Sequence, residues 1–251
     1  HRDLNPFPTR RSSGRLEPPE RSIDVIESIP FKHDAQPSFD ERTIALTFGS
    51  RRVFEAIGIW SEIATDACPI HSIHVSDQGH FGSTHLDRSL INADALGYVV
   101  PSRTLGHALL NRLQDSISIR YHAPAVVASL QTDGDFVNVQ VDNASGDRKA
   151  RLAVLADGGR SPLGQQIGIR RLEKSYPEVV LVAMVATDQD HQHRAYERFT
   201  RHGPLALLPA GHQRFALAWT LPETTAKAYA ELSNDDFLSR LQMSFGERAG
   251  V

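Results

Sequence analysis

One stretch of this sequence constrains the fold most: an apolar run that ends on an acid and two glycines, Leu152-Ala153-Val154-Leu155-Ala156-Asp157-Gly158-Gly159. The apolar run predicts a buried strand, and the glycines predict a tight turn whose backbone can approach a ligand closely. Ser161 and Pro162 are typical of a helix N-cap and first helical position, with Gly168 at the helix end. In α/β proteins ligands bind beyond such strands, so we expect Asp157 to face a sugar or cofactor. A plain strand-to-helix connection is the alternative.

Size and composition exclude several classes of protein. The 251 residues suffice for one large or two medium domains. A single cysteine, Cys68, excludes an intrachain disulfide and, on the sequence alone, a cysteine-based metal site; it also fits a reducing, cytoplasmic compartment. The net charge of −3 supplies no basic field for nucleic acid. No apolar run approaches the roughly 18 residues that cross a bilayer, so we expect a soluble or membrane-peripheral protein.

The N-terminal part predicts one disordered segment, one strand and one helix. Residues 1–22 carry five arginines and four prolines among few aliphatic residues, which is typical of a disordered or non-native segment. Residues 23–27 form a predicted strand that ends on Glu27, an acid placed where dinucleotide folds bind ribose hydroxyls. Ser50 is the expected N-cap of a helix that buries one face and ends near Gly58.

The rest of the chain predicts strands with few helices. Residues 69–100 alternate short apolar pieces with glycines, and a helix follows from about Thr104. A strand at 117–121 and a meander at 126–130 and 136–141 come next, with a third strand expected to run into Asp157. Strands at 179–185, 195–199, 205–208 and 215–220 predict an antiparallel sheet. Ser233 is the expected cap of a last helix.

In this order the chain resembles the class A flavoprotein monooxygenases, and most closely the 2-polyprenyl-6-methoxyphenol hydroxylase family of ubiquinone biosynthesis. The resemblance runs from about residue 22 to the C-terminus. It is carried by four stretches, which are Asp24-Val25-Ile26-Glu27, Phe39-Asp40-Glu41-Arg42-Thr43-Ile44-Ala45-Leu46, Val154-Leu155-Ala156-Asp157-Gly158-Gly159-Arg160-Ser161 and Glu197-Arg198-Phe199-Thr200-Arg201-His202-Gly203-Pro204-Leu205-Ala206-Leu207-Leu208-Pro209. The segment His74-Val75-Ser76-Asp77-Gln78-Gly79-His80 is similar to the ubiquinone-pathway members in particular.

The resemblance implies a mixed α/β fold, in which an FAD-binding nucleotide domain of the aromatic hydroxylase type is interleaved with an antiparallel β-sheet substrate domain. Residues 23–68 and 101–170 would form a partial FAD-binding domain, and residues 69–100 and 171–251 the substrate domain. The implied reaction is hydroxylation of the aromatic ring of a polyprenylated phenol with FAD, NAD(P)H and O2. A flavin C4a-hydroperoxide would carry the oxygen, while the protein supplies position and excludes water.

The same resemblance assigns roles to five residues and names no catalytic side chain. Glu27 matches the acid that holds the adenosine ribose, and Arg42 matches the basic residue near the cofactor's phosphates and flavin. Asp157 and Gly158 match an Asp-Gly motif associated with both FAD and NAD(P)H. Arg103 is a weaker candidate for a cofactor contact. A lipid-like substrate further implies association with the inner membrane surface or with other proteins of ubiquinone biosynthesis.

Two departures from the family pattern lead to alternatives. The sequence before Asp24 contains no GxGxxG, and the family's later Gly-Asp motif would fall beyond residue 251. We therefore expect a chain truncated at both ends that binds FAD weakly or not at all. A non-catalytic fragment that serves as a binding or interaction module is one alternative function. Another flavoprotein of the same fold, a halogenase or a reductase, is the other.

Two histidine pairs, His71/His74 and His191/His193, invite a metal interpretation. Neither pair has a convergent set of carboxylates or cysteines nearby in the sequence, so we predict no metal site.

Overall fold

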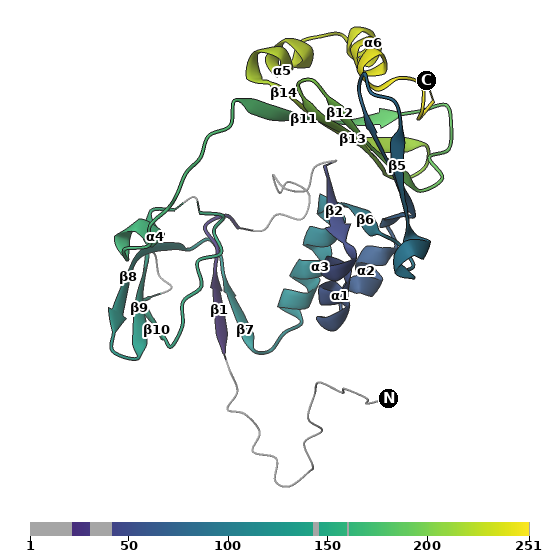
Figure 1. Ribbon diagram of the computed structural model, residues 1–251. Coiled ribbons are helices and arrows are strands. Elements are labelled where there is room, and N and C mark those ends of the chain that lie inside the picture. Colours follow the sequence, from purple (N-terminus) through teal and green to yellow (C-terminus); the bar gives the residue numbers. More distant parts are fainter. Residues whose placement is uncertain (1–21, 31–41, 143–145, 160, 251) are drawn as a thin grey trace, which may run out of the picture. The chain divides into compact units, whose positions relative to one another are not determined.

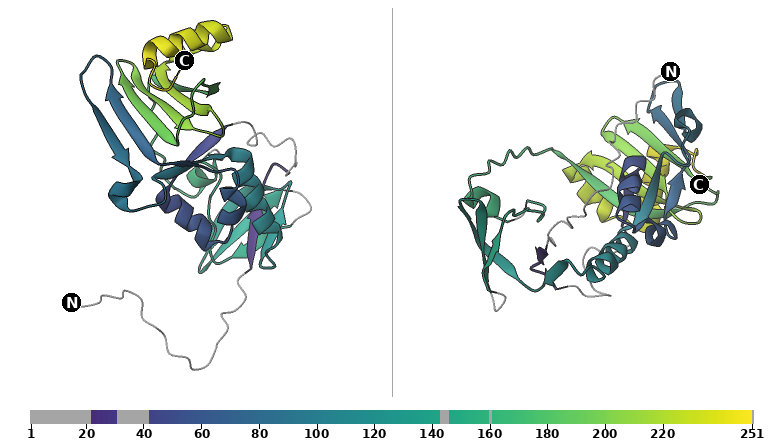
Figure 2. Two further views of the ribbon diagram at one scale, coloured as in Figure 1. Left: turned by 90° about the vertical axis from the view of Figure 1, so that its right-hand side faces the viewer. Right: turned by 90° about the horizontal axis from the view of Figure 1, so that it is seen from below.

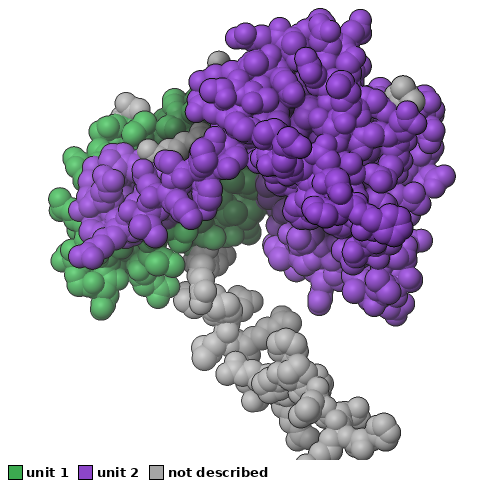
Figure 3. Space-filling model, turned by 45° about the horizontal axis from the view of Figure 1, so that its top comes forward, with its two compact units in different colours: residues 1–30, 113–154 green, residues 31–112, 155–251 purple. Residues whose placement is uncertain are grey.

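The computed structural model describes residues 22–30, 42–142, 146–159 and 161–250. They belong to two compact units, residues 1–30 with 113–154 and residues 31–112 with 155–251 (Figure 3). The predicted disordered segment 1–22, except for Ser22, lies outside the described residues, as do Phe39, Asp40 and Glu41 of the second family-like stretch. The predicted division into FAD-binding and substrate domains stays a prediction. No helix among the described residues is long and apolar enough to cross a membrane.

The first unit contains two small sheets. Strand β1 (Ile23–Ile26) pairs in parallel with β7 (Ile119–His122), and Glu27 follows β1 directly, as predicted. The second sheet is antiparallel, in the order β10-β9-β8, and is formed by β8 (Val126–Asp133), β9 (Phe136–Asp142) and β10 (Arg148–Ala150). The turn between β8 and β9 contains Gly134 with φ of +59°, which suits a tight hairpin.

The second unit begins with a three-stranded antiparallel sheet and its helices. The strands lie in the order β2-β6-β3 and are β2 (Thr43–Thr47), β6 (Gly97–Pro101) and β3 (Cys68–Ile70). The helices are α1 (Phe48–Ala56), α2 (Trp60–Ala64) and α3 (Ser102–Gln114). Ile59, Ile63 and Val100 have no exposed surface and form the centre of this core.

Helix α1 differs from its prediction in two ways. Its N-cap is Thr47, whose hydroxyl accepts a hydrogen bond from the Ser50 backbone N–H at 3.1 Å, so Ser50 is not the cap. The expected buried face is also wrong, because Val53 and Ile57 are 59% and 41% exposed. Of the three expected apolar residues, only Phe54 packs against the core.

The largest element is a six-stranded sheet in the second unit (Figures 1 and 2). Its strands lie in the order β11 (Glu178–Ala186), β14 (Arg214–Pro222), β13 (Gly203–Pro209), β12 (Arg194–Thr200), β4 (Ser72–Asp77) and β5 (Ser83–Asp87). The chain continues from β5 directly into the 3-10 helix η1 (Arg88–Ile91). All neighbours are antiparallel except β12 and β4. The predicted sheet of β11 to β14 is thus confirmed, and β4 and β5 extend it.

Two helices cover one face of this sheet, α5 (Glu223–Ala230) and α6 (Asn234–Phe245) (Figure 1). The Ser233 hydroxyl accepts a hydrogen bond from the Asp236 N–H at 3.2 Å, which confirms the predicted cap. Between helices and sheet lie Phe215, Leu217 and Trp219 of β14, each at most 2% exposed. Burial of this many large apolar side chains makes this layer the main stabilising core.

The strand predicted at residues 152–156 does not form, which corrects the sequence analysis. Strand β10 ends at Ala150, and Leu152 and Val154 are 75% and 74% exposed. No strand in the described part of the chain pairs with this run, so its backbone has no ladder to join. The following helix, α4 (Leu163–Gln166), is a single turn whose N-cap is Pro162 rather than Ser161.

Candidate functional site

The Asp157 turn is built by hydrogen bonds to its own carboxylate. Oδ1 accepts the backbone N–H of Gly159 at 2.9 Å, and Oδ2 accepts both the backbone N–H and the hydroxyl of Ser161. The Ser161 hydroxyl, followed by the Gly159 N–H, lowers the pKa of the Asp157 carboxyl, so the turn carries a fixed negative charge at neutral pH.

The two glycines of this turn both adopt left-handed backbone conformations. Gly158 has φ of +67° and Gly159 has φ of +69°, a region that costs other residues strain energy. A Cβ at Gly158 would meet no atom within 4 Å, so the backbone there borders open space. Arg171 donates a hydrogen bond to the Gly159 carbonyl and holds the far side of the turn. An exposed turn with a bare backbone and a fixed carboxylate fits the close approach of a nucleotide cofactor.

The backbones of Arg42 and Arg103 lie close together where β2 and α3 begin. Arg42 directly precedes β2, and Arg103 is the second residue of α3. The Ser102 N–H donates to the Arg42 carbonyl at 2.9 Å, which fixes the start of α3 beside the start of β2. The two cations therefore lie near the N-terminal end of a 13-residue helix, an end that favours anions such as phosphate.

Glu27 is held by its own turn. Its Oε1 accepts the Ile29 N–H at 2.9 Å and the Ser28 hydroxyl at 3.2 Å. Its backbone is fixed as well, since its N–H donates to the His122 carbonyl and its carbonyl accepts the Ala125 N–H. Glu27 belongs to the first compact unit, whereas Arg42, Arg103, Asp157 and Gly158 belong to the second. Within the second unit, the backbones of the two arginines are neighbours, and Asp157 and Gly158 form the other pair.

The face of the six-stranded sheet that α5 and α6 leave uncovered is apolar and partly exposed. Toward one end it packs on the smaller sheet, where Ala195 and Ala216 meet Cys68 and Ile70. Farther along the same face, Val180, Val182 and Phe199 are about half exposed, at 56%, 58% and 49%. Side chains alternate between the two faces of a strand, so these residues share one surface with their small neighbours Ala206 and Ala218.

One carboxylate lies within this apolar surface, and the sequence analysis did not single it out. Glu197 of β12 stands two residues after Ala195 and pairs with Ala206 on one side and Val75 on the other. Within the described part of the chain it makes no hydrogen bond or ion pair. Burial raises the pKa of the Glu197 carboxyl. An alternating strand with one acid at an inward position is the signal that could have found it.

Comparison with known proteins places this geometry in a family. Residues 31–251 match the family described as "FAD binding domain". The chain belongs to this family. Its fold is therefore the mixed α/β fold of FAD-binding aromatic hydroxylases, as the resemblance implied. The cofactor-binding roles of Glu27, Arg42, Arg103, Asp157 and Gly158 stay predictions.

Relatives of this FAD-binding-domain chain include two proteins named for ubiquinone synthesis. "Ubiquinone hydroxylase UbiL" of Rhodospirillum rubrum is 30% identical over 229 residues, which are 91% of this chain and 53% of that protein. "Ubiquinone biosynthesis monooxygenase COQ6, mitochondrial" of Rattus norvegicus is 23% identical over 239 residues, 90% of this chain and 50% of that protein. The chain thus spans about half the length of the curated relatives it matches.

A solved structure supports the fold of the FAD-binding-domain chain. PqsL of Pseudomonas aeruginosa, described as a probable FAD-dependent monooxygenase, superposes with a TM-score of 0.70 at 21% identity. The superposition covers 87% of this chain and 59% of that protein.

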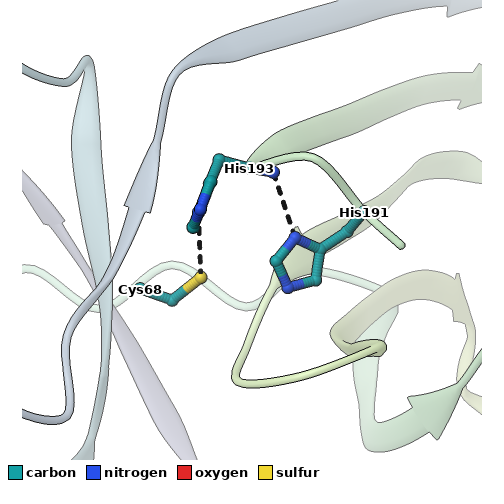
Figure 4. A group of neighbouring side chains, drawn as sticks. All are labelled: Cys68, His191 and His193. Atoms are coloured by element: carbon teal, nitrogen blue, oxygen red, sulfur yellow. Dashed lines mark hydrogen bonds between the residues drawn. The ribbon is translucent and has the colours of Figure 1, made fainter.

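A side-chain cluster corrects one argument from the sequence. The absence of a nearby cysteine counted against a metal site at His191/His193, but the fold places the Cys68 Sγ 3.6 Å from the His193 Nδ1 (Figure 4). Sequence spacing could not reveal this neighbour, because 125 positions separate the two residues.

Proposed function

We propose that this protein takes part in FAD-dependent hydroxylation of the aromatic ring of a polyprenylated phenol, using NAD(P)H and O2. Membership of the FAD-binding-domain family and the similarity to two ubiquinone-pathway proteins support the reaction class. FAD supplies the oxygen-transfer chemistry when it is bound. The side chains of this chain would bind and orient the two reactants and keep water away from them.

The cofactor-binding roles are proposed on the geometry of the two groups. Asp157 and Gly158 would bind through a fixed carboxylate and an unobstructed backbone. Arg42 and Arg103, beside the N-terminal end of α3, would bind phosphate oxygens by charge and hydrogen bonds. Glu27, which follows a parallel strand, would accept hydrogen bonds from ribose hydroxyls.

The observation that carries the proposed substrate class is the uncovered face of the six-stranded sheet. Val180, Val182 and Phe199 offer an apolar surface to a prenyl chain, and the small side chains of Ala206 and Ala218 leave room for a flat ring. Glu197 would accept the phenol proton, which raises electron density on the ring that is to be oxidised. Its raised pKa suits a proton acceptor in apolar surroundings.

A lipid-tailed substrate also bears on where the protein acts. Its prenyl chain resides in the membrane, so we propose that the protein works in the cytoplasm, at the inner membrane surface, alone or with other proteins of ubiquinone synthesis.

Genetic complementation tests this function. The gene that encodes this chain is expressed in a bacterium that lacks a ubiquinone-ring hydroxylase, and quinone precursors are measured by mass spectrometry. Restored ubiquinone is the expected result. Accumulation of the unhydroxylated precursor, although the protein is present and contains flavin, would contradict the proposal.

A matched pair of variants tests the role of Glu197. Glu197→Gln keeps the side-chain shape but removes the proton acceptor, and we expect hydroxylation to slow about 100-fold with unchanged flavin content. Glu231→Gln, on the exposed surface, is the control and should leave the rate unchanged. Equal rates for the two variants would exclude Glu197 as the acceptor.

A further inference from the structure

We propose that Cys68, His191 and His193 bind a divalent transition-metal ion, with zinc as the ion their donors suit best. One thiol and two imidazoles are the donor types that zinc binds in proteins. This proposal is independent of the flavin chemistry, because all three residues belong to the second compact unit and none is among the proposed cofactor or substrate residues.

The spacing of the donors already matches part of a metal site. Cys68 and His193 point toward each other, with 3.6 Å between Sγ and Nδ1 (Figure 4). A tetrahedral zinc ion with ordinary Zn–S and Zn–N bonds holds two such atoms about 3.5 Å apart. One donor atom from each of the three residues lies within 4.8 Å of the other two. Small side-chain movements therefore suffice to bring all three onto one ion.

The backbone that carries the two histidines is held in an unusual conformation. Gln192 and His193 both have positive φ, +49° and +55°, although neither is glycine. Residues other than glycine keep such conformations only where surrounding contacts impose them. Here the His71 N–H donates to the His193 carbonyl at 2.8 Å, and the His193 N–H donates to the His191 Nδ1 at 3.0 Å. The turn thereby fixes His193 above the buried thiol.

Binding an ion would change a few contacts. The Cys68 thiol would release its proton to solvent and bind as thiolate. His191 would bind the ion through Nδ1 and give up the bond from the His193 N–H, while its Nε2–H continues to donate to the Gly211 carbonyl. A water molecule would take the fourth position. His193 is only half-buried, whereas Cys68 and His191 are buried.

The position of the cluster suggests what the ion would do. Cys68 begins β3 of the three-stranded sheet, whereas His191 and His193 lie in the loop that enters β12 of the six-stranded sheet. An ion bound to all three would join these two layers of the second unit at one point. Metal binding to the folded state alone raises stability, so the ion would act as a structural clamp between the layers.

Cobalt(II) is the probe for this site. We would strip the full chain of metal with a chelator and titrate it with Co²⁺, recording the near-ultraviolet band that arises only when cobalt binds a thiolate. The expected result is one Co²⁺ per chain with that band, displacement of cobalt by Zn²⁺, and a higher melting temperature with either ion.

Three variants decide whether the named residues are responsible. Cys68→Ser should abolish the charge-transfer band, and His193→Asn should weaken Co²⁺ binding at least about 100-fold. His80→Asn removes an exposed imidazole outside the cluster and should change nothing. If Cys68→Ser, at a buried position, prevents folding, the Co²⁺ affinity of His193→Asn still tests the site, because His193 is only half-buried and its replacement should be tolerated. Absence of the band in the unaltered chain, or equal losses for His193→Asn and His80→Asn, would overturn the proposal.

Discussion

The six-stranded sheet and the Asp157 turn use their apolar residues in opposite ways. In the sheet, Phe215, Leu217 and Trp219 are at most 2% exposed beneath α5 and α6. Around the turn, Leu152 and Val154 are about three-quarters exposed, although they belong to an equally apolar run. The turn is held instead by hydrogen bonds within a few residues of Asp157. The comparison indicates that the apolar side chains stabilise the sheet, whereas local hydrogen bonds to one carboxylate shape the turn.

The largest expected effect is a loss of stability when a buried side chain of the sheet is removed. Trp219→Ala removes a side chain that packs against Tyr229 and Phe237, and we expect unfolding free energy to fall by about 3–5 kcal/mol. Leu172→Ala, at a position that is 98% exposed, should change it by less than about 0.5 kcal/mol. Urea denaturation of both variants measures the difference. Similar losses at the two positions would refute the assignment of stability to the sheet.

The next effect concerns the turn itself. Gly158→Ala places a Cβ on a left-handed backbone, which should cost about 1–2 kcal/mol and weaken FAD binding by the product of the gene. Gly164→Ala, within α4, meets only ordinary contacts at 3.8 Å and should be neutral or slightly stabilising. Thermal unfolding and flavin fluorescence measure the two effects. An undiminished FAD affinity in the Gly158 variant would remove the turn from the cofactor site.

A smaller loss of stability is expected when the N-cap of α6, one of the two helices that cover the sheet, is removed. Ser233→Ala removes the cap of α6 and should lower unfolding free energy by about 1 kcal/mol. Ser239→Ala, in the middle of the same helix, only removes a bond from its hydroxyl to the Asp235 carbonyl and should be close to neutral. Urea midpoints of the two variants give the answer. A loss at Ser239 as large as at Ser233 would mean that the cap does not stabilise the layer.

The smallest expected effect is a pH dependence on the uncovered face of the sheet. Burial raises the pKa of Glu197 in the folded protein, so folding favours its neutral form. Below pH 4.5, the ordinary pKa of a glutamate, Glu197 is neutral in both the folded and the unfolded protein and does not lower stability. As the pH rises from there through the raised pKa of the folded state, ionisation of Glu197 lowers the free energy of unfolding. Glu197→Gln should therefore stabilise the protein modestly at pH 7 and have little effect near pH 4. A constant difference at both pH values would contradict a buried, ionising carboxylate.

The sheet could be predicted from the sequence because its determinants are local. The apolar runs at 179–185 and 215–220 pair with each other in antiparallel fashion, and the Ser233 cap needs only Asp236 three residues later. The apolar run at 152–156 fails as a predicted strand because no strand of the described residues pairs with it. Strand formation depends on a neighbour, which no local pattern can supply.

The candidate site was predictable to a similar degree. The Asp157 turn and its left-handed glycines follow from the Asp-Gly-Gly sequence. Glu197 was not found, since its importance depends on which face of β12 is uncovered. The approach of Cys68 to His193 is a long-range contact between layers, which composition and spacing cannot indicate.

The central claim is that this protein serves a flavin-dependent hydroxylation of an aromatic ring. The most direct measurement supplies the product of the gene with FAD, NAD(P)H, a prenylated phenol and O2 labelled with the heavy oxygen isotope, and analyses the product by mass spectrometry. The account predicts one labelled oxygen atom on the ring, with one NAD(P)H consumed for each product formed. A hydroxyl group that derives from water, or NAD(P)H oxidation that the phenol does not stimulate and that leaves the ring unchanged, would contradict it.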